Sequence, residues 1–285
     1  MPDSLNLAWA QRGICLSEVG FYSQVIWCLG CAILLATLIP IIGFLALRRS
    51  LPTFDAIALA ASFGSVSAIG FIVATQRLED AGIAFGGHMS ATMAIMESPA
   101  IILAVAAAAF FRNKTGAEGG TLQIREVLHE ALTDGTQLLL LGAMLIGFIT
   151  AEAGKPILQP LFIDLFKCIL ALFLLDMGQQ VARNLGKVSL GQKSALTYTL
   201  VTPLIHAGLA LVCCQVFSIG AGDGVLLMTL AASSSFFAVQ EVLRHAVPEA
   251  NPTLYFGLAL GLNCPLNLTL GIPLWINLSP RYLSP

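Results

Sequence analysis

The chain contains eight apolar stretches, each long enough to cross a lipid bilayer as a helix, and short polar segments separate them. A transmembrane helix needs about 20 apolar residues to span roughly 30 Å of hydrocarbon. The stretches that meet this length are residues 24–47, 54–76, 84–111, 130–151, 159–182, 194–217, 223–243 and 253–278. The pattern predicts an all-α, polytopic membrane protein with eight transmembrane helices.

The composition excludes several classes of protein. Of the 285 residues, 57% are hydrophobic and 11% are charged, whereas soluble domains are about 45–50% apolar and about 25% charged. The formal net charge of −2 provides no basic surface for nucleic acid. The seven cysteines show no pair of CxxC motifs and no His–Cys spacing typical of a metal site. We therefore expect neither a soluble enzyme nor a bound cofactor.

The distribution of lysine and arginine predicts the orientation, because cytoplasmic loops are enriched in both. With both termini outside, one set of basic residues falls in the cytoplasmic segments, namely Arg48, Arg49, Arg112, Lys114, Arg125, Arg183, Lys187, Lys193 and Arg244. The outer segments then hold only Arg12, Arg77, Lys155 and Arg281. The opposite orientation would reverse this bias, so we predict that both termini lie outside.

Two of the stretches resemble each other. Residues 58–68 and 229–238 both place a small, hydroxyl-rich cluster in mid-span, and each is followed by a span in which proline comes after polar residues, at 97–99 and 263–265. The two clusters lie five spans apart, so they cross the membrane in opposite directions. This is typical of the inverted-topology repeats of secondary transporters. The alternative interpretation is that the small residues only let the helices pack closely.

Counting spans from the repeat gives three in the first unit and five in the second. The expected fold is therefore an inverted-repeat transporter with two broken, crossing helices and a 3+5 arrangement. Relative to a 5+5 pattern, two N-terminal spans are lacking. Either the chain starts upstream of Met1 or it is a shortened form.

The two small-residue clusters are the candidate binding sites. Serine and glycine in mid-span weaken a helix, and the half-helix ends then present backbone N–H groups and a dipole near the bilayer midplane. Such breaks suit a small oxyanion and its coupling cation. Glu97, inside the third span, is a candidate Na⁺ or proton ligand because an intramembrane carboxylate is costly without a partner. Asp176 is a second candidate.

One enzymatic interpretation competes with transport. Residues 220–223 read Gly-Ala-Gly-Asp, the GxGD pattern of intramembrane aspartyl proteases, and Asp176 precedes them. Two aspartates sharing a proton can activate water. However, the predicted topology places Asp223 at the outer surface and Asp176 about 25 Å below it at 1.5 Å per residue. We therefore predict that the protein is not an enzyme.

Ordered motifs make the chain resemble the sodium-dependent bicarbonate transporter superfamily. The motifs are Phe-Gly-Ser-Val-Ser at 63–67, Met-Glu-Ser-Pro-Ala at 96–100, Ala-Ala-Ser-Ser-Ser at 231–235, the segment 246–252, and Ile-Pro-Leu at 272–274. The resemblance covers about residues 24–278. It implies a bacterial inner-membrane symporter for bicarbonate and Na⁺, with ten spans in two inverted repeats. It also implies a homotrimer and a cytoplasmic PII-like regulator.

The resemblance assigns the binding residues. It places bicarbonate at Gly64, Ser65, Val66, Ser67, Ser233, Ser234 and Ser235. For Na⁺ we expect Glu97, Ser67, Ser234 and Asp176. The chain departs from the family pattern in three ways: the two leading gate spans are lacking, Phe236 replaces an acid that some relatives have after the serines, and the loop 112–128 is short.

The expected organisation follows from these residues. It comprises an outer N-terminal segment at 1–23, the incomplete first repeat with core helices at 24–111, a cytoplasmic loop at 112–129, gate helices at 130–182, and the core helices of the second repeat at 183–285. Na⁺-coupled uptake of bicarbonate or a similar small anion is the leading hypothesis. A truncated, non-transporting membrane partner of a complete transporter is the alternative.

Overall fold

A computed structural model of the chain describes residues 20–115, 172, 175, 179, 193–236 and 238–283. All regular structure in this part is helical, as the sequence predicts. The predicted stretch 130–151, most of 159–182, and with them Asp176, lie outside the described residues.

The first described block contains four helices. They are α2 (Gly20–Leu47), α3 (Thr53–Gly64), α4 (Ala68–Asp80) and α5 (His88–Thr115). The second block begins with α9 (Lys193–Val216), α10 (Ala221–Ala232) and α11 (Ala238–Ala246). A long final helix alternates α and π turns: α12 (Pro252–Leu258), η2 (Ala259–Asn263), α13 (Cys264–Leu266), η3 (Asn267–Gly271) and α14 (Ile272–Tyr282).

Five helical segments of the described part are long and apolar enough to cross a membrane. They are Gln24–Leu47, Thr53–Asp80, His88–Arg112, Lys193–Val216 and Pro252–Tyr282. The predicted stretch 223–243 is split between the shorter α10 and α11. The helical, multi-pass character is thus confirmed, whereas the number of eight spans and the inverted repeat stay predictions.

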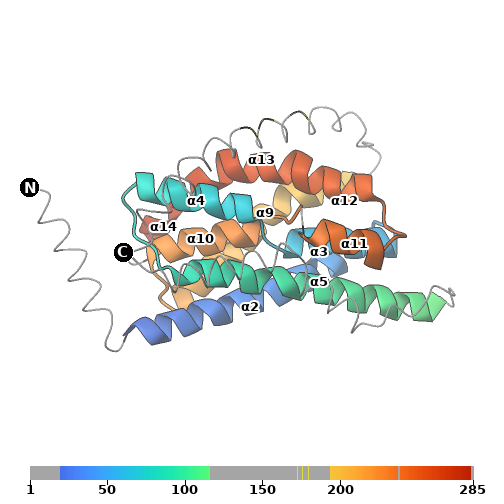
Figure 1. The fold of residues 1–285 in the computed structure, drawn as a ribbon, viewed down its shortest axis with the longest axis horizontal. Coiled ribbons are helices and arrows are strands. Elements are labelled where there is room, and N and C mark those ends of the chain that lie inside the picture. The colour runs from blue at the N-terminus through green and yellow to red at the C-terminus, as the bar shows by residue number, and fades with distance from the viewer. Residues whose placement is uncertain are drawn as a thin grey trace, which may run out of the picture.

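The two small-residue clusters are the places where the chain leaves the helix. Ser65 ends α3 with an extended backbone (φ −103°, ψ 173°), and Ser233 ends α10 in the same way (φ −78°, ψ 171°). Serine favours such breaks because its hydroxyl competes for nearby backbone groups. The segment α3–α4 runs from right to left in Figure 1, and α10–α11 runs from left to right beside it. The two broken segments are therefore antiparallel.

The core forms two apolar clusters on either side of the breaks. One joins α10 to α4, the first half of α5 and the second half of α9. The other joins α3 to α11, α12 and the second half of α5. The two halves of each broken segment thus bury their side chains in different clusters, and the extended serines lie where the two clusters meet.

Two aspartates, one at each end of this core, accept hydrogen bonds from distant loops. Asp55, the third residue of α3, accepts a hydrogen bond from the N–H of Asn251 at 2.7 Å. Asp223, the third residue of α10, accepts one from the N–H of Gly86 at 2.7 Å. Each carboxylate lies in the first turn of its helix, where the dipole stabilises negative charge. Each broken segment is therefore tied to the loop that follows the other one.

The end that carries Asp55 also holds an ion pair. Arg112, at the end of α5, donates two hydrogen bonds of 2.8 Å to the carboxylate of Glu249 and one of 3.1 Å to the carbonyl of Ala246. At the other end, the Nε2 atom of His88 lies 3.4 Å from the carboxylate of Asp223.

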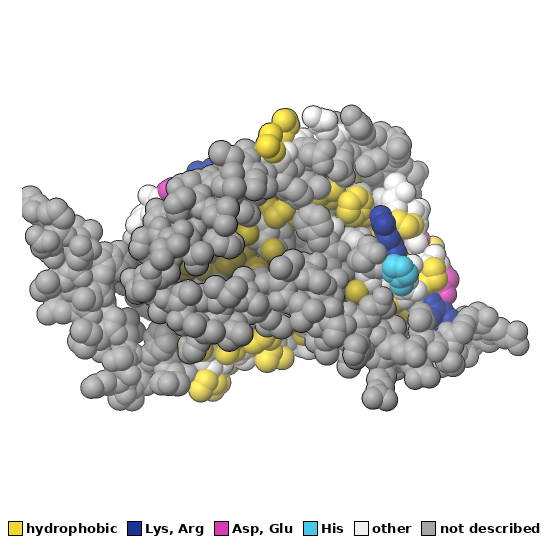
Figure 2. Space-filling view, viewed as in Figure 1, with side chains coloured by type: hydrophobic (Ala, Val, Ile, Leu, Met, Phe, Trp, Pro, Cys, Tyr) yellow, Lys and Arg dark blue, Asp and Glu magenta, His cyan; other side chains and the backbone are white. Residues whose placement is uncertain are grey.

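Charged side chains of the described residues lie mainly toward two ends of the core. On the face shown in Figure 2, charged side chains are visible near the meeting of α11 with α12 and near α4, and hydrophobic side chains lie between them. Exposed large hydrophobic residues occur along α2 and α9, among them Ile33, Leu34, Leu204 and Ile205. An apolar belt between two polar ends is the surface expected in a bilayer.

Candidate functional site: the crossing of two broken helices

The two extended breaks touch each other directly. The N–H of Ser235 donates to the carbonyl oxygen of Ser62 at 2.8 Å. The N–H of Ser67 donates to the Oγ atom of Ser233 at 2.9 Å. Backbone groups that each half-helix leaves unpaired at its break are thus partly satisfied by the other break, which holds the two segments together at one point.

A third side chain reinforces the crossing. The amide nitrogen of Gln240, on α11, lies 3.3 Å from the Oγ atom of Ser62 and 3.2 Å from the carbonyl oxygen of Ser235. Gln240 is buried. It therefore bridges the last turn of α3 and the second break, and it joins the two segments through a side chain as well as through the backbone.

A small polar hollow opens beside the crossing. Its volume is about 190 Å³ when the space open to the outside is included. Its lining residues come from both breaks and from the final helix: Ser67, Gly70, Ser233, Ser234, Phe236, Asn263, Cys264, Asn267 and Leu268. The hollow therefore combines hydroxyl and amide groups with the ends of half-helices, at a depth where the surrounding helices are apolar.

Helix ends of opposite polarity meet at this hollow. Ser67 caps the N-terminus of α4, where its Oγ atom accepts a hydrogen bond from Gly70 at 3.2 Å. The first-turn N–H groups of a helix have no acceptor within the helix, and they carry partial positive charge. The last carbonyls of α10, which ends at Ala232, carry partial negative charge. The N-terminus of α4 thus favours an anion, and the C-terminus of α10 favours a cation.

The structure brings together all the predicted residues of the two clusters. Gly64, Ser65, Val66 and Ser67 are buried at the first break, and Ser233, Ser234 and Ser235 are buried at the second. Gly64 is required for packing, because a Cβ atom added there would lie 2.6 Å from the Cβ atom of Pro40. The binding roles of these residues stay predictions.

The main chain of Glu97 contacts the first break. The Oγ atom of Ser65 donates to the carbonyl oxygen of Glu97 at 3.4 Å. Glu97 is half-buried on α5 and does not belong to the lining of the hollow. Within the described ranges, no cluster of three or more His, Cys, Asp or Glu side chains could hold a metal ion.

Sequence reasoning missed three amide side chains at the site, Gln240, Asn263 and Asn267. Asn263 donates to the Oγ atom of Ser234 at 2.8 Å and to the carbonyl oxygen of Ala232 at 3.3 Å. The available signal was the similarity between 97–99 and 263–265, which predicts equivalent positions for Glu97 and Asn263. It could not show that the amide of Asn263 contacts the second break.

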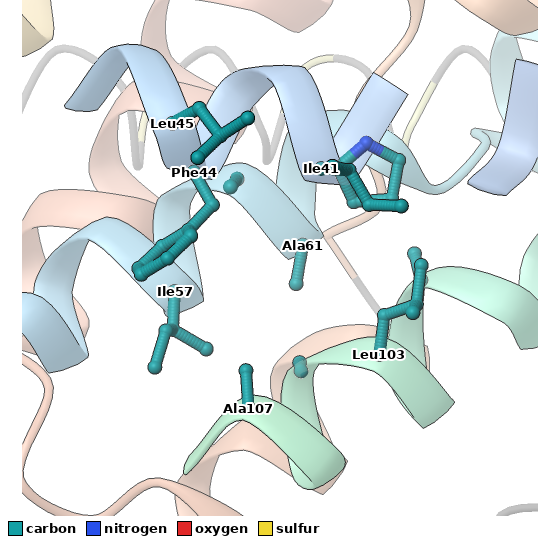
Figure 3. A pocket seen from close by; sticks show the side chains of 11 residues that line it. Ile41, Phe44, Leu45, Ile57, Ala61, Leu103 and Ala107 are labelled. Carbon is teal, nitrogen blue, oxygen red and sulfur yellow. The ribbon is translucent and has the colours of Figure 1, made fainter. Parts of the chain in front are cut away.

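A larger, apolar groove lies between α2, α3 and α5 (Figure 3). Its volume is about 480 Å³ when the space open to the outside is included, and it is lined mainly by alanine, leucine and isoleucine. Ile57 and Ala61 of α3 line it opposite Leu103 and Ala107 of α5. These side chains offer no hydrogen-bond donor, so the groove is unsuited to an oxyanion.

Comparison with known families now identifies the type of protein. A family model, described as the Na⁺-dependent bicarbonate transporter superfamily, matches residues 10–279. The chain belongs to this superfamily. The match includes both broken segments and the final helix, so the crossing and its hollow lie within the family's shared region. A comparison with curated proteins finds no match. A member of this transporter superfamily is not expected to be an enzyme, in agreement with the prediction from the sequence.

Proposed function

We propose that the chain is a symporter that imports bicarbonate, or a similar small anion, together with Na⁺ by alternating access. The observation that carries the proposal is the direct contact of two antiparallel broken helices, Ser235 to Ser62 and Ser67 to Ser233. Broken helices that meet within the membrane form the substrate and ion sites of many secondary transporters. Irregular backbone at this depth is tolerated only where it is buried in protein or lines a cavity.

The first break supplies the donors for an anion. Ser67 and Gly70, at the start of α4, line the hollow, and a helix N-terminus is a ready anion site. Ser67 adds a hydroxyl whose own proton has no acceptor among the described residues. Bicarbonate is a flat oxyanion that can accept from both kinds of donor.

The second break supplies the oxygens for a cation. Ser233 and Ser234, which directly follow the C-terminus of α10, line the same hollow as Ser67 and Gly70. In transporters with broken helices, half-helix C-terminal ends and unwound carbonyls coordinate Na⁺. Two adjacent charges of opposite sign stabilise each other, which is the physical basis of coupling. Glu97 and Asp176 remain proposed ligands.

The larger assembly is also part of the proposal. The antiparallel course of α3–α4 and α10–α11 supports an inverted repeat. The family resemblance supports a homotrimer, a PII-like regulator and a bacterial inner-membrane location with both termini outside. If one Na⁺ moves with one bicarbonate, transport is electroneutral. A second Na⁺ would add about 2.3 kcal/mol per 100 mV of membrane potential.

Uptake of radiolabelled bicarbonate into proteoliposomes that contain the full chain tests the proposal. We expect accumulation with an inward Na⁺ gradient and none with an equal K⁺ gradient. Ser67→Ala should reduce the Na⁺-driven rate at least tenfold. Thr37→Ala is the matched control, because the Thr37 hydroxyl bonds only to its own helix on an exposed face.

Either of two results would contradict the proposal. One is equal accumulation with Na⁺ and K⁺ gradients, which would exclude coupling to Na⁺. The other is an equal loss of uptake in Ser67→Ala and Thr37→Ala, which would place transport away from the crossing. Glu97→Gln tests the proposed carboxylate separately: unchanged dependence on Na⁺ would remove Glu97 from the cation site.

A further inference from the structure

Asn263 combines complete burial with a position in the polar hollow. Its exposed fraction is 0%, and it lines the hollow together with Ser67 and Ser234. It is the last residue of the π segment Ala259–Asn263. Single π turns inside long helices occur frequently at functional sites, because the extra residue turns side chains in a new direction.

The hydrogen bonds of Asn263 determine which way its amide group faces. The nitrogen lies 3.3 Å from the carbonyl oxygen of Ala232 and 2.8 Å from the Oγ atom of Ser234. A carbonyl can only accept, so the atom facing Ala232 must be the NH₂ group. The Oδ1 atom therefore faces another way, and it is buried without a hydrogen-bond partner among the described residues.

Asn267 provides an internal comparison in the same helix. Its amide nitrogen likewise donates to a carbonyl of α10, that of Thr229, at 3.3 Å. Its Oδ1 atom, however, accepts from the indole N–H of Trp275 at 3.4 Å. Buried polar atoms are nearly always paired. The unpaired oxygen of Asn263 is thus the exception within a pair of otherwise similar residues.

We propose that the Oδ1 atom of Asn263 is a ligand of the coupling Na⁺ in the hollow that Ser67 and Ser234 also line. This inference rests on the proposed function, because it specifies the cation site of that transport. An amide oxygen only accepts, so it attracts a hard cation and repels an anion. It carries no formal charge, so the Na⁺ keeps its positive charge for the adjacent anion.

Na⁺ binding to the purified full chain, without bicarbonate, tests the inference. The melting temperature in detergent is measured against NaCl concentration, with choline chloride keeping the ionic strength constant, and it yields a half-saturation concentration. We expect Asn263→Ala to raise this concentration at least tenfold. We expect Asn267→Ala, which loses the same bond to an α10 carbonyl, to change it by less than threefold.

A second pair of variants removes the effect of a cavity. Asn263→Leu and Asn267→Leu keep most of the side-chain volume while removing the amide, so both chains should fold even where alanine does not. The same tenfold difference between positions 263 and 267 is expected. A similar shift at both positions would mean that loss of packing, not of a ligand, weakens Na⁺ binding, and would overturn the inference.

Other outcomes also overturn the inference. Unchanged half-saturation in Asn263→Ala with a lower melting temperature would mean that the oxygen holds only a buried water. A wild-type chain stabilised equally by Na⁺ and choline would exclude the site. The transport proposal fails independently: Na⁺ binding that depends on Asn263 can be present without bicarbonate uptake, and Na⁺-driven uptake can persist in Asn263→Ala.

Discussion

The two broken segments, α3–α4 and α10–α11, share one plan. Each begins with an aspartate as its third helical residue, Asp55 or Asp223, that accepts a backbone hydrogen bond from the loop after the other segment. Each leaves the helix at a serine, Ser65 or Ser233. The shared plan fixes the ends of both segments and brings the two breaks to one point.

The segments differ in the helix that packs beside each break. Beside the first break, α5 remains α-helical, and Glu97 offers its main-chain carbonyl to Ser65. Beside the second break, the final helix contains π turns, and Asn263 offers its side chain to Ser234. The helix beside the first break thus contributes a backbone group to that break, whereas the helix beside the second break contributes a side chain.

The largest effect is expected at the residue before each break. The first segment has Gly64 there, whereas the second already has Ala232. A Cβ atom on Gly64 would lie 2.6 Å from the rigid ring of Pro40. We expect Gly64→Ala to lower the free energy of unfolding by about 3 kcal/mol, the upper end for overpacking. Thermal unfolding of the purified chain measures the change.

Gly208→Ala is the control for this substitution. Nothing lies within 4 Å of the Cβ position at Gly208, and alanine is the better helix former by about 1 kcal/mol. A stability of Gly64→Ala equal to that of the wild-type chain would show that the first break adapts to a side chain as the second one does.

Removing the hydrogen bonds that Asp55 and Asp223 accept should give the next largest loss of stability. Asp55→Ala and Asp223→Ala each remove a charge-assisted hydrogen bond to a backbone N–H, and we expect a loss of about 2 kcal/mol for each. The ties lie at opposite ends of the core (Figure 1), so the losses should add in the double variant. Chemical unfolding of the single and double variants measures this. Strongly non-additive losses would mean that the two ends are coupled through the crossing.

The sequence predicted the positions of the breaks because serine and glycine act locally on the backbone. The helix ends at Gly64 and Ala232 fall in the predicted clusters. The ties of Asp55 and Asp223 were not predicted, since each joins residues far apart in the chain. Asp223 in particular attracted attention only through a protease-like pattern, whereas its carboxylate binds the backbone of Gly86.

The role of Asn263 was likewise beyond the sequence. Its position after an apolar run predicted a span but not the π turn that contains it. A π turn adds one residue per turn and rotates every later side chain, and no simple residue pattern predicts where it occurs. The side chain that faces the hollow therefore depends on packing against α10, which only the structure describes.

The ion pair at one end of the core gives a smaller, pH-dependent effect. Hydrogen bonds from Arg112 lower the pKa of Glu249 below its ordinary value of 4.5. A lowered pKa adds stability above the ordinary value, and the added stability disappears as the pH falls through the lowered one. Because the Glu249 side chain is 36% exposed, solvent screening limits the effect to about 1 kcal/mol.

Melting temperatures between about pH 6 and pH 3 measure this contribution. We expect Glu249→Gln to melt lower than the wild-type chain at the upper end of the range and to approach it at the lower end. Glu79→Gln, an exposed acid at the end of α4, is the control for the general effect of acid. A constant difference between Glu249→Gln and the wild-type chain across the range would contradict the prediction.

The smallest effect is expected at Ser65, and a comparison with Ser233 separates the two serines that open the breaks. Ser65 makes one long bond of 3.4 Å to the Glu97 carbonyl, so Ser65→Ala should cost about 0.5 kcal/mol. Ser233 accepts from the N–H of Ser67 at 2.9 Å and donates to Leu230 at 2.7 Å, so Ser233→Ala leaves a buried N–H unpaired and should cost about 1–2 kcal/mol. Thermal unfolding of both variants measures the difference. Equal losses would mean that the two breaks depend equally on their serine hydroxyls. The contrast between a backbone contact beside the first break and side-chain contacts beside the second would then not hold.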